Sequence, residues 1–81
     1  MLRMRTIEQI YADHHDSPAL RGLVAVMHDK FTMRSRYALL EYEAGMEGRV
    51  ECTELYRALS RAESAQIARL SATLASELER R

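Results

Sequence analysis

The residues best suited to chemistry in this sequence are three histidines with aspartates beside them. His14 and His15 are adjacent, with an aspartate on either side, and His28 is followed by Asp29. Imidazole nitrogens and carboxylates can ligate zinc or a harder metal. However, the chain lacks the Glu-x-x-His spacing of helical di-iron proteins. We therefore interpret His14 and His15 as an exposed turn and His28 as part of a polar helix face, and we expect no metal site.

Cys52 is the only cysteine, so no disulfide can form within the chain. A reactive cysteine needs a nearby cation or a helix N-terminus, and Glu51 and Glu54 beside Cys52 oppose formation of the thiolate. We therefore expect Cys52 to be a small buried residue. The sequence contains neither a Gly-x-Ser-x-Gly motif nor a glycine-rich phosphate loop. These observations predict no catalytic residue, no enzymatic activity and no cofactor.

Length and charge limit the kind of molecule that could position these residues. A chain of 81 residues predicts one domain, 1–81, and its 47% hydrophobic and 30% charged residues are typical of a globular protein. Twelve basic residues balance twelve acidic ones, which makes nucleic acid an unfavoured partner. No apolar run approaches the roughly 18 residues of a membrane span, so we expect no membrane partner. A lone cysteine and an N-terminus without an apolar signal segment predict the cytoplasm.

The pattern of helix-forming and helix-breaking residues predicts an all-α fold. The chain has one proline and three glycines, whereas alanine, leucine, arginine and glutamate are abundant. Thr6 can cap a short helix over about 6–13. Asp16 or Ser17 can cap the next helix, in which Pro18 occupies a favoured first position.

Two further boundaries complete the predicted hairpin. The second helix spans about 18–46, and a loop of about 45–49 follows, in which Gly45 and Gly48 both suit positions of positive φ. A short loop forces the last helix, about 50–79, to return antiparallel. Ser60 could start a capping box with Glu63, so a continuous helix and a break at 60 both remain open. The prediction is therefore three to four helices in a single domain.

Apolar spacing indicates which faces of the long helices are buried. The second helix carries two adjacent apolar stripes, one led by Leu20 and the other containing Leu23, Met33 and Leu40. In the last helix most large apolar side chains share one sector about 140° wide at the helical period, in which Glu63 is the misfit. That sector contains Cys52, Leu55, Leu59, Ile67, Leu70, Leu74 and Leu78.

The last helix also carries small residues opposite the leucine sector, which would let a second helix approach closely. A chain this short buries only about 60% of its unfolded surface, and no disulfide reinforces it. The short first helix could cover this second face, and so could another chain. We expect a second chain, as a homo-oligomer or a foreign protein, to complete the core. The predicted partner interface consists of Leu59, Ile67, Leu70, Leu74, Leu78, Ala68 and Ala72.

These features predict a non-catalytic protein–protein interaction module, acting as an adaptor, chaperone-like protein or regulator through helix–helix packing. A small nucleic-acid-binding regulator that uses the arginines of the first half is an alternative. The segment CTELYRALSRAESAQIARL and the acidic loop region resemble the small helical-hairpin co-chaperones of type III secretion needle subunits. That resemblance covers about the last 40 residues and implies a hairpin that holds an aggregation-prone partner. It rests on a Leu/Ala spacing that many helical hairpins share, and it assigns no functional residue.

Overall fold

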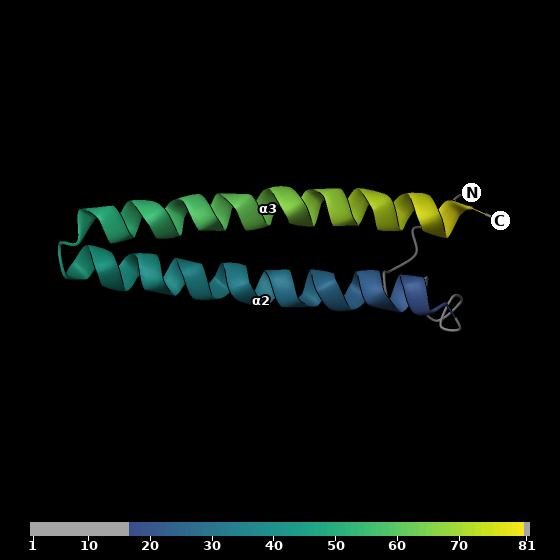
Figure 1. Ribbon diagram of the computed structural model, residues 1–81, viewed down its shortest axis with the longest axis horizontal. Helices are drawn as coiled ribbons and strands as arrows, with labels where there is room; N and C mark the ends of the chain where they lie inside the picture. The colour runs from purple at the N-terminus through teal and green to yellow at the C-terminus, as the bar shows by residue number, and fades with distance from the viewer. Residues whose placement is uncertain (1–16, 81) are drawn as a thin grey trace, which may run out of the picture.

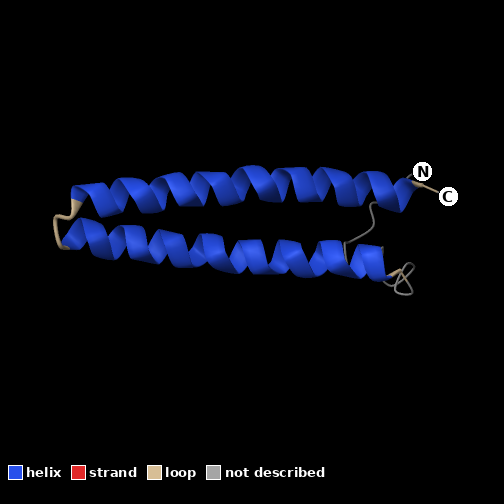
Figure 2. Cartoon of the chain, in the orientation of Figure 1, coloured by secondary structure: helices blue, strands red, loops and turns tan. Residues whose placement is uncertain are grey.

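Two long antiparallel helices joined by a tight loop form the described part of the chain (Figure 1). The computed structural model describes residues 17–80. Helix α2 spans Pro18–Met46 and helix α3 spans Val50–Glu79, and this part of the chain contains no strand (Figure 2). The predicted all-α class and the helical hairpin are therefore confirmed. The predicted helix at about 6–13, together with His14 and His15, lies outside the described residues.

Helix α2 begins where the sequence supplies both a cap and a proline. Ser17 is the N-cap, and its hydroxyl accepts a hydrogen bond of 3.2 Å from the amide of Leu20. Pro18 follows at the first helical position, where its missing N–H costs nothing. The helix then continues without a break through its middle. There the hydroxyls of Thr32 and Ser35 donate to backbone carbonyls four residues earlier, so they remain satisfied inside the helix.

The loop contains only residues 47–49 and depends on one glycine. Gly48 has a φ of 71°, in the left-handed region that a side chain disfavours. The amide of Arg49 donates to the carbonyl of Ala44 over 2.9 Å, which closes the end of α2. The prediction that Gly45 also needs a positive φ is wrong. Gly45 lies within α2, because the helix continues one residue beyond it to Met46.

Helix α3 is continuous through Ser60, so the structure adopts the unbroken one of the two alternatives. Glu63 does not act as a capping residue there. Its carboxylate lies 3.3 Å from the Nζ of Lys30 on α2. An ion pair across the hairpin therefore accounts for the one acidic residue in the apolar sector of this helix.

The two helices meet along an interhelical seam with a coiled-coil period. Its positions are spaced alternately by three and four residues, and all of them are buried or half-buried. The seam of α2 contains Leu20, Leu23, Met27, Lys30, Arg34, Tyr37, Glu41 and Ala44. The seam of α3 contains Thr53, Tyr56, Ser60, Glu63, Ile67, Leu70, Leu74 and Glu77.

Three polar contacts between α2 and α3 fix the register of one helix against the other. Besides Lys30–Glu63, Arg34 donates to the hydroxyl of Ser64 over 3.1 Å, and Arg57 pairs with Glu41 over 3.1 Å. Polar groups at seam positions disfavour a shifted register, because a slip would leave them without partners. The centre of the seam therefore contributes more to register than to burial of apolar surface.

The hairpin covers little apolar surface by itself. Among residues 17–80, the buried ones are Leu20, Ala44, Ile67 and Leu74, and Leu74 is the most enclosed at 2% exposure. Large apolar side chains such as Leu55 remain more than half exposed. Within the described residues, neither helix has a stretch that is both long and apolar enough to cross a membrane.

Candidate interaction surface

The residues singled out for chemistry do not converge in the structure. His28 and Asp29 are both exposed on α2. Residues 17–80 contain no group of three or more histidine, cysteine or acidic side chains that could hold a metal ion. The predicted burial of Cys52 is wrong, because the side chain is exposed. It precedes the seam position Thr53 by one residue and so lies beside the seam, close to the loop.

The structure distributes the predicted interface residues over three environments. Ile67 and Leu74 are buried against α2, so one chain already covers them. The other leucines of the set, Leu59, Leu70 and Leu78, are half-buried. The two alanines, Ala68 and Ala72, are exposed on α3.

The predicted apolar sector of α3 does not coincide with its seam. Leu55 was expected on the buried face, but 56% of its surface is exposed. The cause is the seam period of about 3.5 residues, which differs from the 3.6 of a straight helix. Near the loop, the seam therefore contains Thr53 and Tyr56, and Leu55 lies to one side of the seam.

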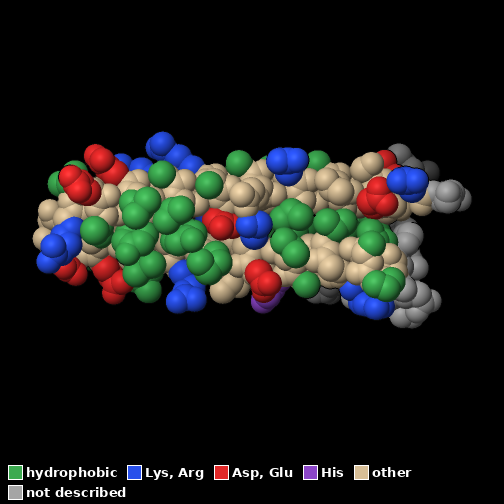
Figure 3. Space-filling model, viewed as in Figure 1, with side chains coloured by type: hydrophobic (Ala, Val, Ile, Leu, Met, Phe, Trp, Pro, Cys, Tyr) green, Lys and Arg blue, Asp and Glu red, His purple; other side chains and the backbone are tan. Residues whose placement is uncertain are grey.

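Displaced apolar residues of both helices gather on one flank of the hairpin near the loop (Figure 3). Met33 and Leu40 each precede a seam position of α2 by one residue, and Leu59 does the same on α3. In an antiparallel pair these positions lie on the same side, as the groove shared by Leu40 and Cys52 also shows. Leu55 belongs to the same strip of α3, because it lies four residues before Leu59. We call Met33, Leu40, Leu55 and Leu59 the apolar patch.

The opposite flank is less uniform. Phe31, at 43% exposure, and Tyr42, at 60%, contribute its large apolar surface from α2. The guanidinium of Arg34 lies 5.0 Å from the centre of the Phe31 ring, and Arg57 of α3 pairs with Glu41 on this side. Cations therefore contact aromatic and acidic side chains of this flank. On the patch flank leucines of both helices meet, and the exposed Arg36 borders them on α2, three residues after Met33.

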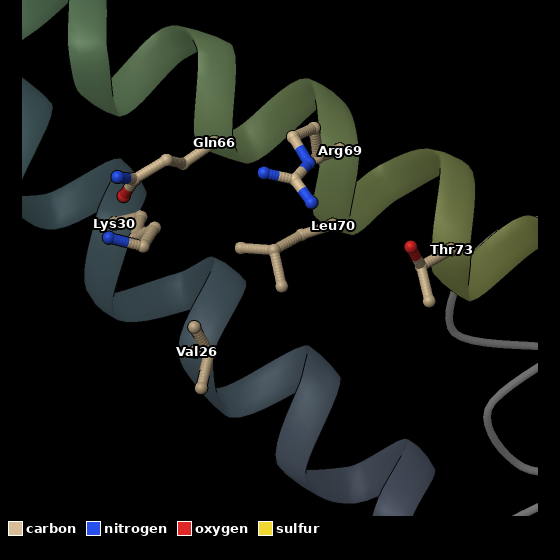
Figure 4. Close-up of a pocket in the computed structure, with 6 residues that line it drawn as sticks. All are labelled: Val26, Lys30, Gln66, Arg69, Leu70 and Thr73. Atoms are coloured by element: carbon tan, nitrogen blue, oxygen red, sulfur yellow. The ribbon is translucent and has the colours of Figure 1, made fainter.

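A shallow groove of about 320 Å³ continues the patch flank toward the chain ends. Leu70 of α3 points toward α2, where Val26 and Lys30 lie, and Arg69 and Gln66 line the α3 side (Figure 4). The groove thus has an apolar base and a cationic edge. Such an arrangement suits an amphipathic helix that carries an acidic side chain.

The patch flank carries charges of both signs rather than a continuous basic surface. The Lys30–Glu63 pair separates the apolar patch from the groove, and the Glu63 side chain is only 16% exposed. Further along lie the exposed Arg69 of α3 and the exposed Asp29 of α2. Neither has an ion-pair partner within residues 17–80. Both charges are available to a partner.

The apolar patch can be found in the sequence only once the seam register is known. Met33 and Leu40 belonged to the second predicted stripe of α2, and Leu55 and Leu59 belonged to the sector of α3. The misfit Glu63 was the available signal. If Glu63 is assigned to a seam position opposite Lys30, the predicted seam of α3 contains Tyr56 and leaves Leu55 to one side.

No protein-family model matches this chain, and no curated protein or solved structure is significantly similar to it.

Proposed function

We propose that this chain is a non-catalytic helical interaction module that binds another protein chain through the apolar patch. The observation that carries the proposal is the apolar patch itself, in which Leu55 is exposed and Met33, Leu40 and Leu59 are only half-buried. Leu55 alone is 56% exposed, although the hairpin has few buried apolar residues. Contiguous exposed apolar surface of this kind is typical of a site that another chain covers.

The class of module follows from what this surface can do. An open apolar strip between two helices accepts a further helix packed along the hairpin, as in helical bundles. An adaptor, a chaperone-like protein and a regulator all use such packing. We propose the cytoplasm as the compartment, on the basis of the single cysteine.

Nucleic-acid binding is the less favoured proposal. A reader of phosphates needs a row of unpaired cations. Within the described residues, Lys30, Arg49, Arg57 and Arg80 are each paired with a carboxylate, and the sequence has no net charge. A mobility shift with duplex DNA at two salt concentrations would separate the two proposals, since a salt-sensitive complex would favour the nucleic-acid one.

Photo-crosslinking in the cells that make the protein tests the proposal. A photoreactive amino acid replaces Leu55 in the patch, and in a matched variant it replaces Leu39, which is equally exposed at 60% but lies outside the patch. We expect polypeptide adducts from position 55 in several-fold excess over those from position 39. Equal yields at both positions, or adducts at position 55 that contain no polypeptide, would overturn the proposal.

A further inference from the structure

We propose that the chain covering the apolar patch is a second copy of this one. The two hairpins would form a four-helix bundle with both loops at the same end. The α3 helix of each copy would lie on α2 of the other. This inference rests on the proposed function, because it assigns an occupant to the same surface.

Apolar complementarity is the first ground. The patch occupies the loop half of the flank and contains residues of both helices. The contacts Arg57–Glu41 and Arg34–Ser64 show that Leu59 lies between the levels of residues 34 and 41 on α2. When a second hairpin is laid on the flank with its loop at the same end, its Leu59 lies between Met33 and Leu40 of the first. The two-fold axis repeats this contact.

Charge complementarity selects the orientation. With both loops at one end, Glu63 of each copy lies over Lys30 of the other, because these two residues are level within a single hairpin. The two ion pairs then form a ring of alternating charge. With the loops at opposite ends, α2 of one copy would lie on α2 of the other. Lys30 would then approach the cations on α2 of the other copy. Like charges at close range disfavour that arrangement.

The unpaired Arg69 of the groove and the unpaired Asp29 of α2 supply an independent match. Arg69 lines the groove with Val26 and Lys30, so it lies between the levels of these two residues on α2, as Asp29 does. Within one hairpin the two side chains lie on different helices, on the outer edges of the flank. When α3 of a second copy lies on α2, its Arg69 comes to the side of Asp29. The same pair forms twice by symmetry.

The area of the flank is adequate for a stable dimer. Helices of 29 and 30 residues are about 45 Å long, and two packed helices present a face about 20 Å wide. One face therefore offers about 900 Å² per copy, close to the roughly 800 Å² per partner of a standard stable interface. A second copy can thus cover the flank over its full length.

Light scattering on a size-exclusion column tests the occupant. We expect the purified full-length chain to have twice the 9.3 kDa mass of one chain. Leu55→Glu places a charge on the patch without removing a buried side chain, and we expect it to give a helical monomer. Leu39→Glu, at a matched exposed position, is expected to leave the dimer intact. A monomeric unmodified chain would overturn the dimer, and so would dissociation by both variants alike.

Charge reversal tests the orientation. Arg69→Asp and Asp29→Arg are each expected to raise the dimer dissociation constant at least tenfold, and the double variant is expected to restore it within about threefold. Arg61→Asp on α3, outside the flank, is the control and should change it less than threefold. Failure of the rescue would overturn the proposed orientation. Adducts of position 55 with a foreign chain, from a protein that is monomeric when pure, would overturn the second copy and leave the proposed function standing.

Discussion

At the scale of single residues, Glu63 shows how a polar side chain can specify a helical hairpin. Its side chain is 16% exposed, and its carboxylate lies 3.3 Å from the ammonium of Lys30. Removing a charge from water is costly, and the attraction of a half-buried pair offsets that cost only while both partners are present. The pair therefore favours this register over a shifted one more than it adds to the total free energy of unfolding.

We predict that Glu63→Gln lowers the free energy of unfolding by about 1 kcal/mol, because it leaves the Lys30 ammonium without its counter-charge. The double variant Lys30→Met/Glu63→Met should be at least as stable as the unmodified chain, since apolar side chains of similar volume suit the seam. Urea unfolding followed by circular dichroism measures both. A double variant less stable than Glu63→Gln alone would show that the pair is a net source of stability.

Two glycines near the loop should respond oppositely to the same substitution. Gly48→Ala is predicted to destabilise the chain by about 1 kcal/mol, because Gly48 has a φ of 71°. Gly45→Ala should stabilise it by about 0.5–1 kcal/mol, because Gly45 is helical and a methyl group there meets no neighbour within 4 Å. Thermal melts of the two variants under identical conditions make the comparison. Changes of the same sign would contradict the loop geometry.

At the scale of the elements, the sequence predicted the helices more reliably than their facing sides. Pro18, the cap at Ser17 and the glycine at 48 act locally, so the hairpin could be anticipated from them. The seam could not, because its position depends on which side chains of α2 meet those of α3. Leu55 and Cys52 were assigned to the buried sector for that reason, and both are exposed.

The surface residues were harder to predict than the core. Ile67 and Leu74 have apolar neighbours at the helical period, so their burial against α2 is in line with the predicted apolar sector. The apolar patch joins residues about 20 positions apart on different helices, and only the register brings them together.

Leu74 and Leu55 provide a matched test of the assigned seam. Leu74→Ala should lower the free energy of unfolding by about 2–5 kcal/mol, since the side chain is 2% exposed and its loss leaves a cavity. Leu55→Ala removes the same atoms from an exposed site, so its effect on the isolated hairpin should be well below this. Both losses are measured on the monomeric hairpin. Leu74→Ala is therefore made in the Leu55→Glu background, and Leu55→Ala is unfolded at low chain concentration. Equal losses in the two variants would place Leu55 in the hairpin core, against the seam described here.

At the scale of the whole molecule, the hairpin would be half of the proposed four-helix bundle. Two helices can bury only the residues between them, and residues 17–80 accordingly contain four buried positions. A second copy on the patch flank would enclose Met33, Leu40, Leu55 and Leu59 and would supply partners for Arg69 and Asp29. Association would then stabilise the folded hairpin by mass action, so the dimer would unfold at a higher temperature than the isolated hairpin.

The dependence of thermal unfolding on chain concentration tests this most directly. For a dimer that unfolds to free chains, mass action raises the melting temperature with concentration. With an unfolding enthalpy of about 0.7 kcal/mol per residue, the rise should be about 5 °C for each tenfold increase. The measurement is a series of circular dichroism melts of the unmodified chain over two decades of concentration, with Leu55→Glu as the monomeric control. A melting temperature of the unmodified chain that does not change across this range would contradict the account.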